Sequence, residues 1–71
     1  MRMNQNQTWV KGKRGKPVCL NSVSYRNGVT IVTAESDKLT EKQFIRALKT
    51  DWPETTFFYR MEEGYWIAEE F

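Results

Sequence analysis

The residues with the clearest chemistry in this chain are the cations of one short segment, Lys11-Gly12-Lys13-Arg14-Gly15-Lys16. Lysine and arginine side chains neutralise phosphates and release counterions, which gives affinity for a nucleic acid without sequence selectivity. The two glycines would let the backbone of the segment approach a phosphodiester closely. This segment, called the basic loop below, predicts a binding site for a polyanion.

Two aromatic residues and one further cation accompany the basic loop. Trp9 lies just before it, and Tyr25 and Arg26 follow after a short strand-like stretch. An exposed ring beside cations stacks on an unpaired base, at about 1–3 kcal/mol per base, and a basic hairpin tip can enter a DNA groove. We therefore predict a surface for DNA or RNA made of Trp9, Lys11, Lys13, Arg14, Lys16, Tyr25 and Arg26.

Charge is distributed unevenly along the chain, although the net charge is only +2. The first acidic residue is Glu35, whereas four glutamates and no base follow position 60 (Glu62, Glu63, Glu69 and Glu70). These carboxylates form an acidic patch for a basic protein, or they dock on the basic loop and mask it. Surface ion pairs contribute about 0–1 kcal/mol each, so masking requires several pairs acting together.

The composition argues against an enzyme and against a metal centre. The chain has no histidine and a single cysteine, Cys19. It therefore lacks the usual acid–base catalyst at neutral pH, and it has no pair of thiols for an internal disulfide or a Cys-rich zinc site. Adjacent glutamates on a strand point to opposite faces, so neither glutamate pair converges on one substrate. We expect a non-enzymatic protein without a cofactor or metal.

The hydrophobic pattern predicts five strands, over residues 8–10, 17–25, 29–33, 55–61 and 65–68. Asn27-Gly28 predicts a type I′ turn between the second and third strands, because both residues accept positive φ. The alternation of apolar and polar residues slips by one position near Asn21-Ser22, and this slip predicts a β-bulge.

One helix is predicted between the third and fourth strands. Residues 40–43 match a capping box that begins at Thr40, and Leu39 and Phe44 are spaced as a hydrophobic staple. Pro53 predicts that the helix ends by Asp51. The cations of this helix fall on one stripe, which either extends the surface of the basic loop or is an ordinary solvated face (Lys42, Arg46 and Lys49).

These elements indicate an α+β domain over residues 8–71, in which a small antiparallel sheet of about five strands packs against one helix in the order β-β-β-α-β-β. Residues 1–7 are polar, and we expect a flexible tail there. No apolar run is long enough to cross a membrane, and the absence of a disulfide scaffold favours a cytoplasmic location. The predicted core consists of Val10, Val18, Leu20, Val23, Ile31, Phe44, Ile45, Leu48, Phe57, Tyr59 and Trp66.

The C-terminal strands carry aromatic residues on both faces, which is typical of strands that contact a partner. An alternative function is therefore that of an inhibitor or adaptor that docks on another protein through Phe58, Tyr65 and Ile67. The compact size and polar start resemble the small accessory proteins of phages and mobile elements. Our main expectation is a nucleic-acid-binding domain that acts as a monomer or a homodimer.

Overall fold

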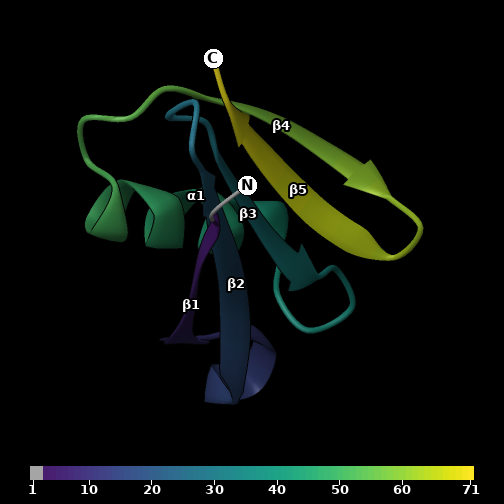
Figure 1. Ribbon diagram of the computed structural model, residues 1–71. Helices are drawn as coiled ribbons and strands as arrows, with labels where there is room; N and C mark the ends of the chain where they lie inside the picture. The colour runs from purple at the N-terminus through teal and green to yellow at the C-terminus, as the bar shows by residue number, and fades with distance from the viewer. Residues whose placement is uncertain (1–2) are drawn as a thin grey trace.

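The computed structural model describes residues 3–71, which form one antiparallel sheet and one helix (Figure 1). The strands are β1 (Met3–Lys11), β2 (Pro17–Tyr25), β3 (Thr30–Glu35), β4 (Phe57–Glu62) and β5 (Tyr65–Glu70), and the helix is α1 (Glu41–Asp51). Their order across the sheet is β1-β2-β3-β5-β4, because β5 folds back between β3 and β4. The predicted α+β fold and its β-β-β-α-β-β order are confirmed.

The sheet has one covered face and one open face. In Figure 1, α1 crosses behind β2 and β3, and no other described element covers the front of these strands. Along β2, Val18, Leu20 and Ser22 are buried toward the helix, whereas the residues between them face the opposite side, called the open face below. The core on the helix side consists of Val18, Leu20, Val32, Ala34, Leu39, Phe44, Ala47, Leu48, Phe57 and Ala68.

The β-bulge predicted near Asn21-Ser22 is wrong. The register of β1 and β2 runs without interruption from the pair Met3–Tyr25 to the pair Lys11–Pro17. Ser22 occupies the core position that the prediction gave to an apolar residue, and its Oγ donates a hydrogen bond to the carbonyl oxygen of Asn6 at 3.5 Å. A small hydroxyl with a hydrogen-bond partner is tolerated in a core, so no bulge is needed to bring an apolar residue to this position.

The continuous register corrects the predicted core at several positions. Val23 and Ile31 are opposite each other on β2 and β3, and they lie partly exposed on the open face. Tyr59 is 41% exposed, because β4 leaves the core after Phe57, and Ile45 is only partly buried. The remaining predicted core residues are buried or pack against the core (Val10, Val18, Leu20, Phe44, Leu48, Phe57 and Trp66).

The turns of the two hairpins have different geometries. At Asn27-Gly28 only Gly28 has positive φ (91°), and Tyr25 donates its N–H to the carbonyl oxygen of Val29. This is a three-residue loop closed by a left-handed glycine, so the predicted type I′ turn is wrong there. The β4–β5 hairpin instead has positive φ at both central residues, Glu63 (50°) and Gly64 (82°), as a type I′ turn requires.

The first strand begins earlier than the sequence indicated. From Met3 onward the chain pairs with β2, where we expected a tail over residues 1–7 and a domain beginning at residue 8. Residues 1 and 2 of that expected tail lie outside the described residues. β1 is an edge strand on which Asn6 and Gln7 are exposed, and Gln7 donates a hydrogen bond from Nε2 to Oδ1 of Asn21 at 3.5 Å.

The predicted helix is confirmed at both ends. Oγ1 of Thr40 accepts a hydrogen bond from the Gln43 N–H (3.1 Å), and Oε1 of Gln43 accepts one from the Thr40 N–H (2.9 Å), which completes the capping box. The helix ends at Asp51, one residue before the capping residue Trp52. Trp52 packs edge-on against Phe57. No helix in the described part of the chain has the length and apolar character needed to cross a membrane.

Candidate nucleic-acid interface

The basic loop is a tight turn that closes on itself. A short 3₁₀ turn, η1 (Lys13–Gly15), contains two consecutive residues with positive φ, Arg14 (59°) and Gly15 (70°). The Gly12 N–H donates to the carbonyl oxygen of Lys16 at 2.8 Å, and the Lys16 N–H donates to that of Lys13 at 3.2 Å. The backbone is therefore fixed by its own hydrogen bonds, and the long side chains project from it.

Gly12 anchors this loop to the rest of the fold. The residue is buried, its carbonyl oxygen accepts a hydrogen bond from Gln43 Nε2 at 2.9 Å, and the next N–H, of Lys13, donates to Lys38 at 2.8 Å. A Cβ at Gly12 would collide with the Lys38 carbonyl oxygen and the Val18 side chain. The expectation that Gly12 leaves room for a phosphodiester is therefore wrong, because protein atoms already fill that space.

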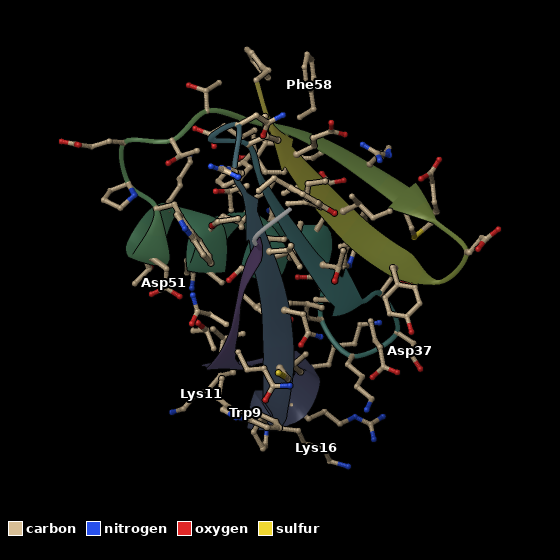
Figure 2. The ribbon with its side chains drawn as sticks, in the orientation of Figure 1. Trp9, Lys11, Lys16, Asp37, Asp51 and Phe58 are labelled. Atoms are coloured by element: carbon tan, nitrogen blue, oxygen red, sulfur yellow. The ribbon has the colours of Figure 1, made fainter. Side chains whose placement is uncertain are left out.

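The cations of the basic loop all point into solvent. Lys11, Lys13, Arg14 and Lys16 are exposed, and Figure 2 shows Lys11 and Lys16 projecting from the same end of the molecule, near Trp9. None of the ion pairs found among residues 3–71 involves these cations. The same holds for Arg26, which is exposed in the β2–β3 turn. The basic loop therefore presents uncompensated positive charge to the solvent.

The C-terminal glutamates do not mask this charge. Glu62 and Glu69 form ion pairs with Arg60 on β4, at 3.0 Å and 3.1 Å respectively. The hydrogen bond to Glu62, and to a smaller extent the one to Glu69, raises the pKa of Arg60. Glu70 accepts a hydrogen bond from the Thr30 N–H at 3.1 Å. These residues belong to β4 and β5, whereas the basic loop follows β1 at the opposite edge of the sheet. Of the two roles we considered for the acids, masking is excluded.

Trp9 adds an exposed ring to the cationic end. It is opposite Cys19 across the β1–β2 pair and is 66% exposed. A groove of about 380 Å³ runs between β1 and α1, and Trp9, Lys11, Gln43 and Arg46 are among the residues that line it. Of the basic loop only Lys11 lines this groove, and Arg46 and Asp51 of α1 line it too. The Trp9 side chain shares the open face with Cys19, so the ring lies on the side of β1 away from α1.

Arg46 is a candidate contact that the sequence prediction left open. The cationic stripe on the helix was visible in the sequence, but only the packing shows which of its members adjoin the loop. Lys42 and Lys49 are exposed on the same helix and are not among the residues that line the groove. A second hollow, of about 440 Å³, lies on the other side of the loop between Lys13–Val18 and Asp37–Lys38.

The structure separates the predicted site into two parts. Trp9, Lys11 and the rest of the basic loop share one end of the sheet, but Tyr25 and Arg26 lie at the far end of β2. β2 has nine residues, so its ends are about 27 Å apart at about 3.4 Å per residue. Tyr25 and Arg26 are close to the basic loop in sequence, but the chain crosses the sheet once along β2 between them, so they lie at the opposite end.

The residues of the alternative site lie together on the open face of the C-terminal hairpin. Phe58 is 58% exposed and contacts Phe71, with the rings tilted by 38° and their centroids 4.0 Å apart, and Tyr65 is 45% exposed. Ile67 is partly buried, and it lines a hollow of about 590 Å³ with Tyr65 and Glu63. The hairpin therefore presents exposed rings, as a docking surface requires.

The described residues contain no group of three or more histidine, cysteine or acidic side chains placed to hold a metal ion. Cys19 is a partly buried free thiol on the open face. Comparison of the chain with models of known protein families, with curated proteins and with solved structures found no match.

Proposed function

We propose that this protein is a non-enzymatic nucleic-acid-binding domain whose site is the cationic end of the sheet. The observation that carries the proposal is the juxtaposition of exposed, unpaired cations with an exposed indole ring (Trp9, Lys11, Lys13, Arg14 and Lys16). Cations bind the phosphates of any sequence, and the ring supplies a stacking surface for a base. Tyr25 and Arg26 are left out of this site because they lie at the other end of β2.

Single-stranded nucleic acid fits this surface better than a duplex. The Trp9 ring lies on the open face and stacks on a base only if that base is unpaired. Lys11 also lines the groove between β1 and α1, where Arg46 adds a second cation for a backbone that passes this edge of the sheet. We therefore expect contacts through phosphates and one stacked base.

The expected affinity depends strongly on salt. Each phosphate contact with a single strand contributes about 0.7 to the slope of log K against log salt, and each contact with a duplex about 0.9. With the four exposed cations of the basic loop, the slope should be about −3 to −4. Loss of two of these contacts should reduce the slope by about half.

The test is a fluorescence-anisotropy titration of a short labelled single strand and a matched duplex at several salt concentrations. The double variant Lys13→Glu/Arg14→Glu should weaken binding strongly and flatten the salt slope. The matched control is Lys42→Glu/Lys49→Glu, which changes the net charge equally at exposed helix positions away from the groove. Equal losses in the two double variants would contradict the proposed site, because they would reflect net charge alone.

The ring and the cations are tested separately. Trp9→Ala should weaken single-strand binding by about 5- to 150-fold, since one stacked base contributes about 1–3 kcal/mol, and it should leave the salt slope unchanged. Tyr25→Ala, at the far end of β2, serves as the control and should bind as the parent protein does. A Trp9 variant with unchanged affinity for the single strand would remove the stacking part of the proposal.

A second candidate function is docking on another protein through the C-terminal hairpin. The exposure of Phe58 and Tyr65 supports it, because aromatic residues are enriched at protein interfaces. Its test is the amide spectrum of the labelled protein in lysate with and without added oligonucleotide. Shifts confined to residues 57–67 that the oligonucleotide does not displace would favour this function, and shifts confined to residues 9–16 would count against it.

A further inference from the structure

The outer edge of β4 is unusually apolar for an exposed strand. Phe58 (58% exposed), Tyr59 (41%) and Met61 (59%) all lie on this six-residue strand. Phe58 points to the open face, whereas Tyr59 and Met61 point to the helix side, since neighbours on a strand alternate. The helix side of this edge is therefore apolar at Tyr59 and Met61, whereas the open face carries Phe58 beside the charged residues Arg60 and Glu62. Phe57 at the start of β4 is buried against the core, but Figure 1 shows the β4–β5 hairpin extending away from α1, which leaves the helix side of β4 uncovered beyond that residue.

The other edge of the sheet does not share this character. β1 carries exposed Asn6, Gln7 and Lys11, and polar or lysine-bearing edge strands resist pairing with another sheet. β4 has no proline and no lysine, and its pairing with β5 is regular from Phe57 to Glu62. Its one cation, Arg60, is held by Glu62 and Glu69 of the same chain. β4 therefore lacks the proline, lysine and bulge that protect many edge strands, and its exposed charges Arg60 and Glu62 are paired with each other.

We propose that β4 pairs antiparallel with β4 of a second copy of this chain. A twofold axis perpendicular to the sheet then joins the two five-stranded sheets into one continuous sheet. The occupant is a second copy because the strand is complementary to itself in one register. Pairing satisfies the free backbone groups of the edge and covers Phe58, Tyr59 and Met61 on both faces at once.

The side chains select the register. Opposed residues of an antiparallel pair share a face. The twofold axis must therefore lie at a residue that is opposite its own copy, because an axis between two residues would oppose side chains on different faces. Only axes at Tyr59 or Arg60 overlap nearly the whole strand, Phe57–Glu62. An axis at Arg60 opposes two guanidinium groups and places Phe58 against Glu62 of the second copy. An axis at Tyr59 opposes Tyr59 to its own copy and places each Arg60 against the ring of Phe58, a favourable cation–π arrangement.

The size of the interface predicts a weak dimer. A large side chain that is about half exposed contributes on the order of 100 Å², so Phe58, Tyr59, Met61 and neighbouring Phe71 provide on the order of 800 Å² over two copies. Stable interfaces bury about 1,200–2,000 Å². We therefore expect a dimer that dissociates on dilution, with a Kd in the micromolar range or above. The basic loops would lie at the two far edges of the joined sheet, so dimerisation does not depend on nucleic acid.

Sedimentation velocity of the free protein over a wide concentration range tests the proposal. The parent protein should shift from monomer to dimer with increasing concentration. Tyr59→Lys opposes two ammonium groups at the axis and should weaken the dimer at least tenfold. The matched control is Tyr65→Lys, which makes the same change at a similarly exposed tyrosine on the interior strand β5, and it should leave dimerisation within twofold of the parent. Circular dichroism confirms that each variant is folded.

A charge swap tests the register itself. Tyr59→Lys and Tyr59→Glu should each be monomeric, and their equimolar mixture should recover a heterodimer, because position 59 is opposite itself only with the axis at Tyr59. A mixture that stays monomeric overturns this register. A parent protein that stays monomeric at every concentration, or one whose dimer is weakened equally by Tyr65→Lys, overturns edge pairing in favour of a different protein on β4 or of contact through the open face.

Hydrogen exchange of the unmodified protein gives an independent readout. The outward amides of residues 57–62 should become protected as the concentration rises, whereas the amides of β1 should not change. Protection that appears on β1 or on the open face alone would contradict the proposal. Because these experiments contain no nucleic acid, their failure would leave the proposed binding site at the basic loop unaffected.

Discussion

Substitution of Gly12 by alanine is the sharpest test of how the basic loop is built. Gly12 has a negative φ of −100°, so its backbone conformation does not require glycine. The requirement is one of space, because a Cβ at this position would lie within 3.0 Å of both the Lys38 carbonyl oxygen and the Val18 side chain. Backbone and a buried core residue cannot yield as the end of a flexible side chain would. The loop must therefore move away from the 36–38 segment and the helix.

The structure gives the magnitude of this change. Overpacking of a filled site costs about 1–3 kcal/mol. Displacement of the loop also weakens two hydrogen bonds, Lys13 N–H to Lys38 (2.8 Å) and Gln43 Nε2 to Gly12 (2.9 Å), at about 1 kcal/mol each. We expect a loss of about 2–4 kcal/mol in the free energy of unfolding. For a domain of this size that loss corresponds to a fall in Tm of about 10–30 °C.

Urea titration followed by far-UV circular dichroism measures the effect. The control is Gly15→Ala in the same loop, where nothing lies within 4 Å of the new Cβ and the only cost is the positive φ of 70°, about 1–2 kcal/mol. Gly12→Ala should therefore be clearly the less stable of the two variants. Equal stability of Gly12→Ala and the parent protein, or a larger loss in Gly15→Ala, would refute the packing role of Gly12.

Three further changes probe other elements. Thr40→Ala removes the capping box with Gln43 and should cost about 1 kcal/mol of unfolding free energy in urea titration. Glu63→Asn places a residue tolerant of positive φ at the β4–β5 turn, where φ is 50°. It should raise the free energy of unfolding by about 0.5–1 kcal/mol, which appears as a higher urea midpoint. Lys38→Met removes the hydrogen bond to Glu35 that raises the pKa of Lys38 above 10.5. The stability of the parent relative to this variant should be constant below about pH 10 and fall as the pH rises through the raised pKa.

The turns illustrate why local patterns predict an element better than its geometry. Asn27-Gly28 correctly predicted a hairpin, but the pairing of Tyr25 with Val29 makes the loop three residues long, so only Gly28 needs positive φ. Glu63-Gly64 adopts the two-residue turn despite a glutamate at a strained position, because Glu62 and Tyr65 are held opposite each other by the sheet. Strand register, which is set by many distant pairs, decided both outcomes.

The candidate sites were predicted to different extents for the same reason. The cations and the aromatic rings were visible as residue types, and the exposure of Phe58 and Tyr65 agrees with the two-sided pattern of the C-terminal strands. The error was to treat nearness in sequence as nearness in space for Tyr25. The contribution of Arg46 to the groove beside Trp9 depends on how α1 packs on the sheet, which no local pattern specifies.

The helix and strands of this protein follow from local signals in the chain, because capping, turn-forming residues and apolar periodicity act over a few neighbouring residues. The sequence therefore predicted α1 with its capping box, the strand order along the chain and the charge of the basic loop. Which faces are covered depends on the tertiary structure. The same holds for the space beside Gly12, which Lys38 and Val18 occupy, and for the position of the glutamates on β4 and β5, away from the basic loop. These features arise from contacts between residues far apart in the chain, whose register and packing are fixed only when the whole sheet has formed.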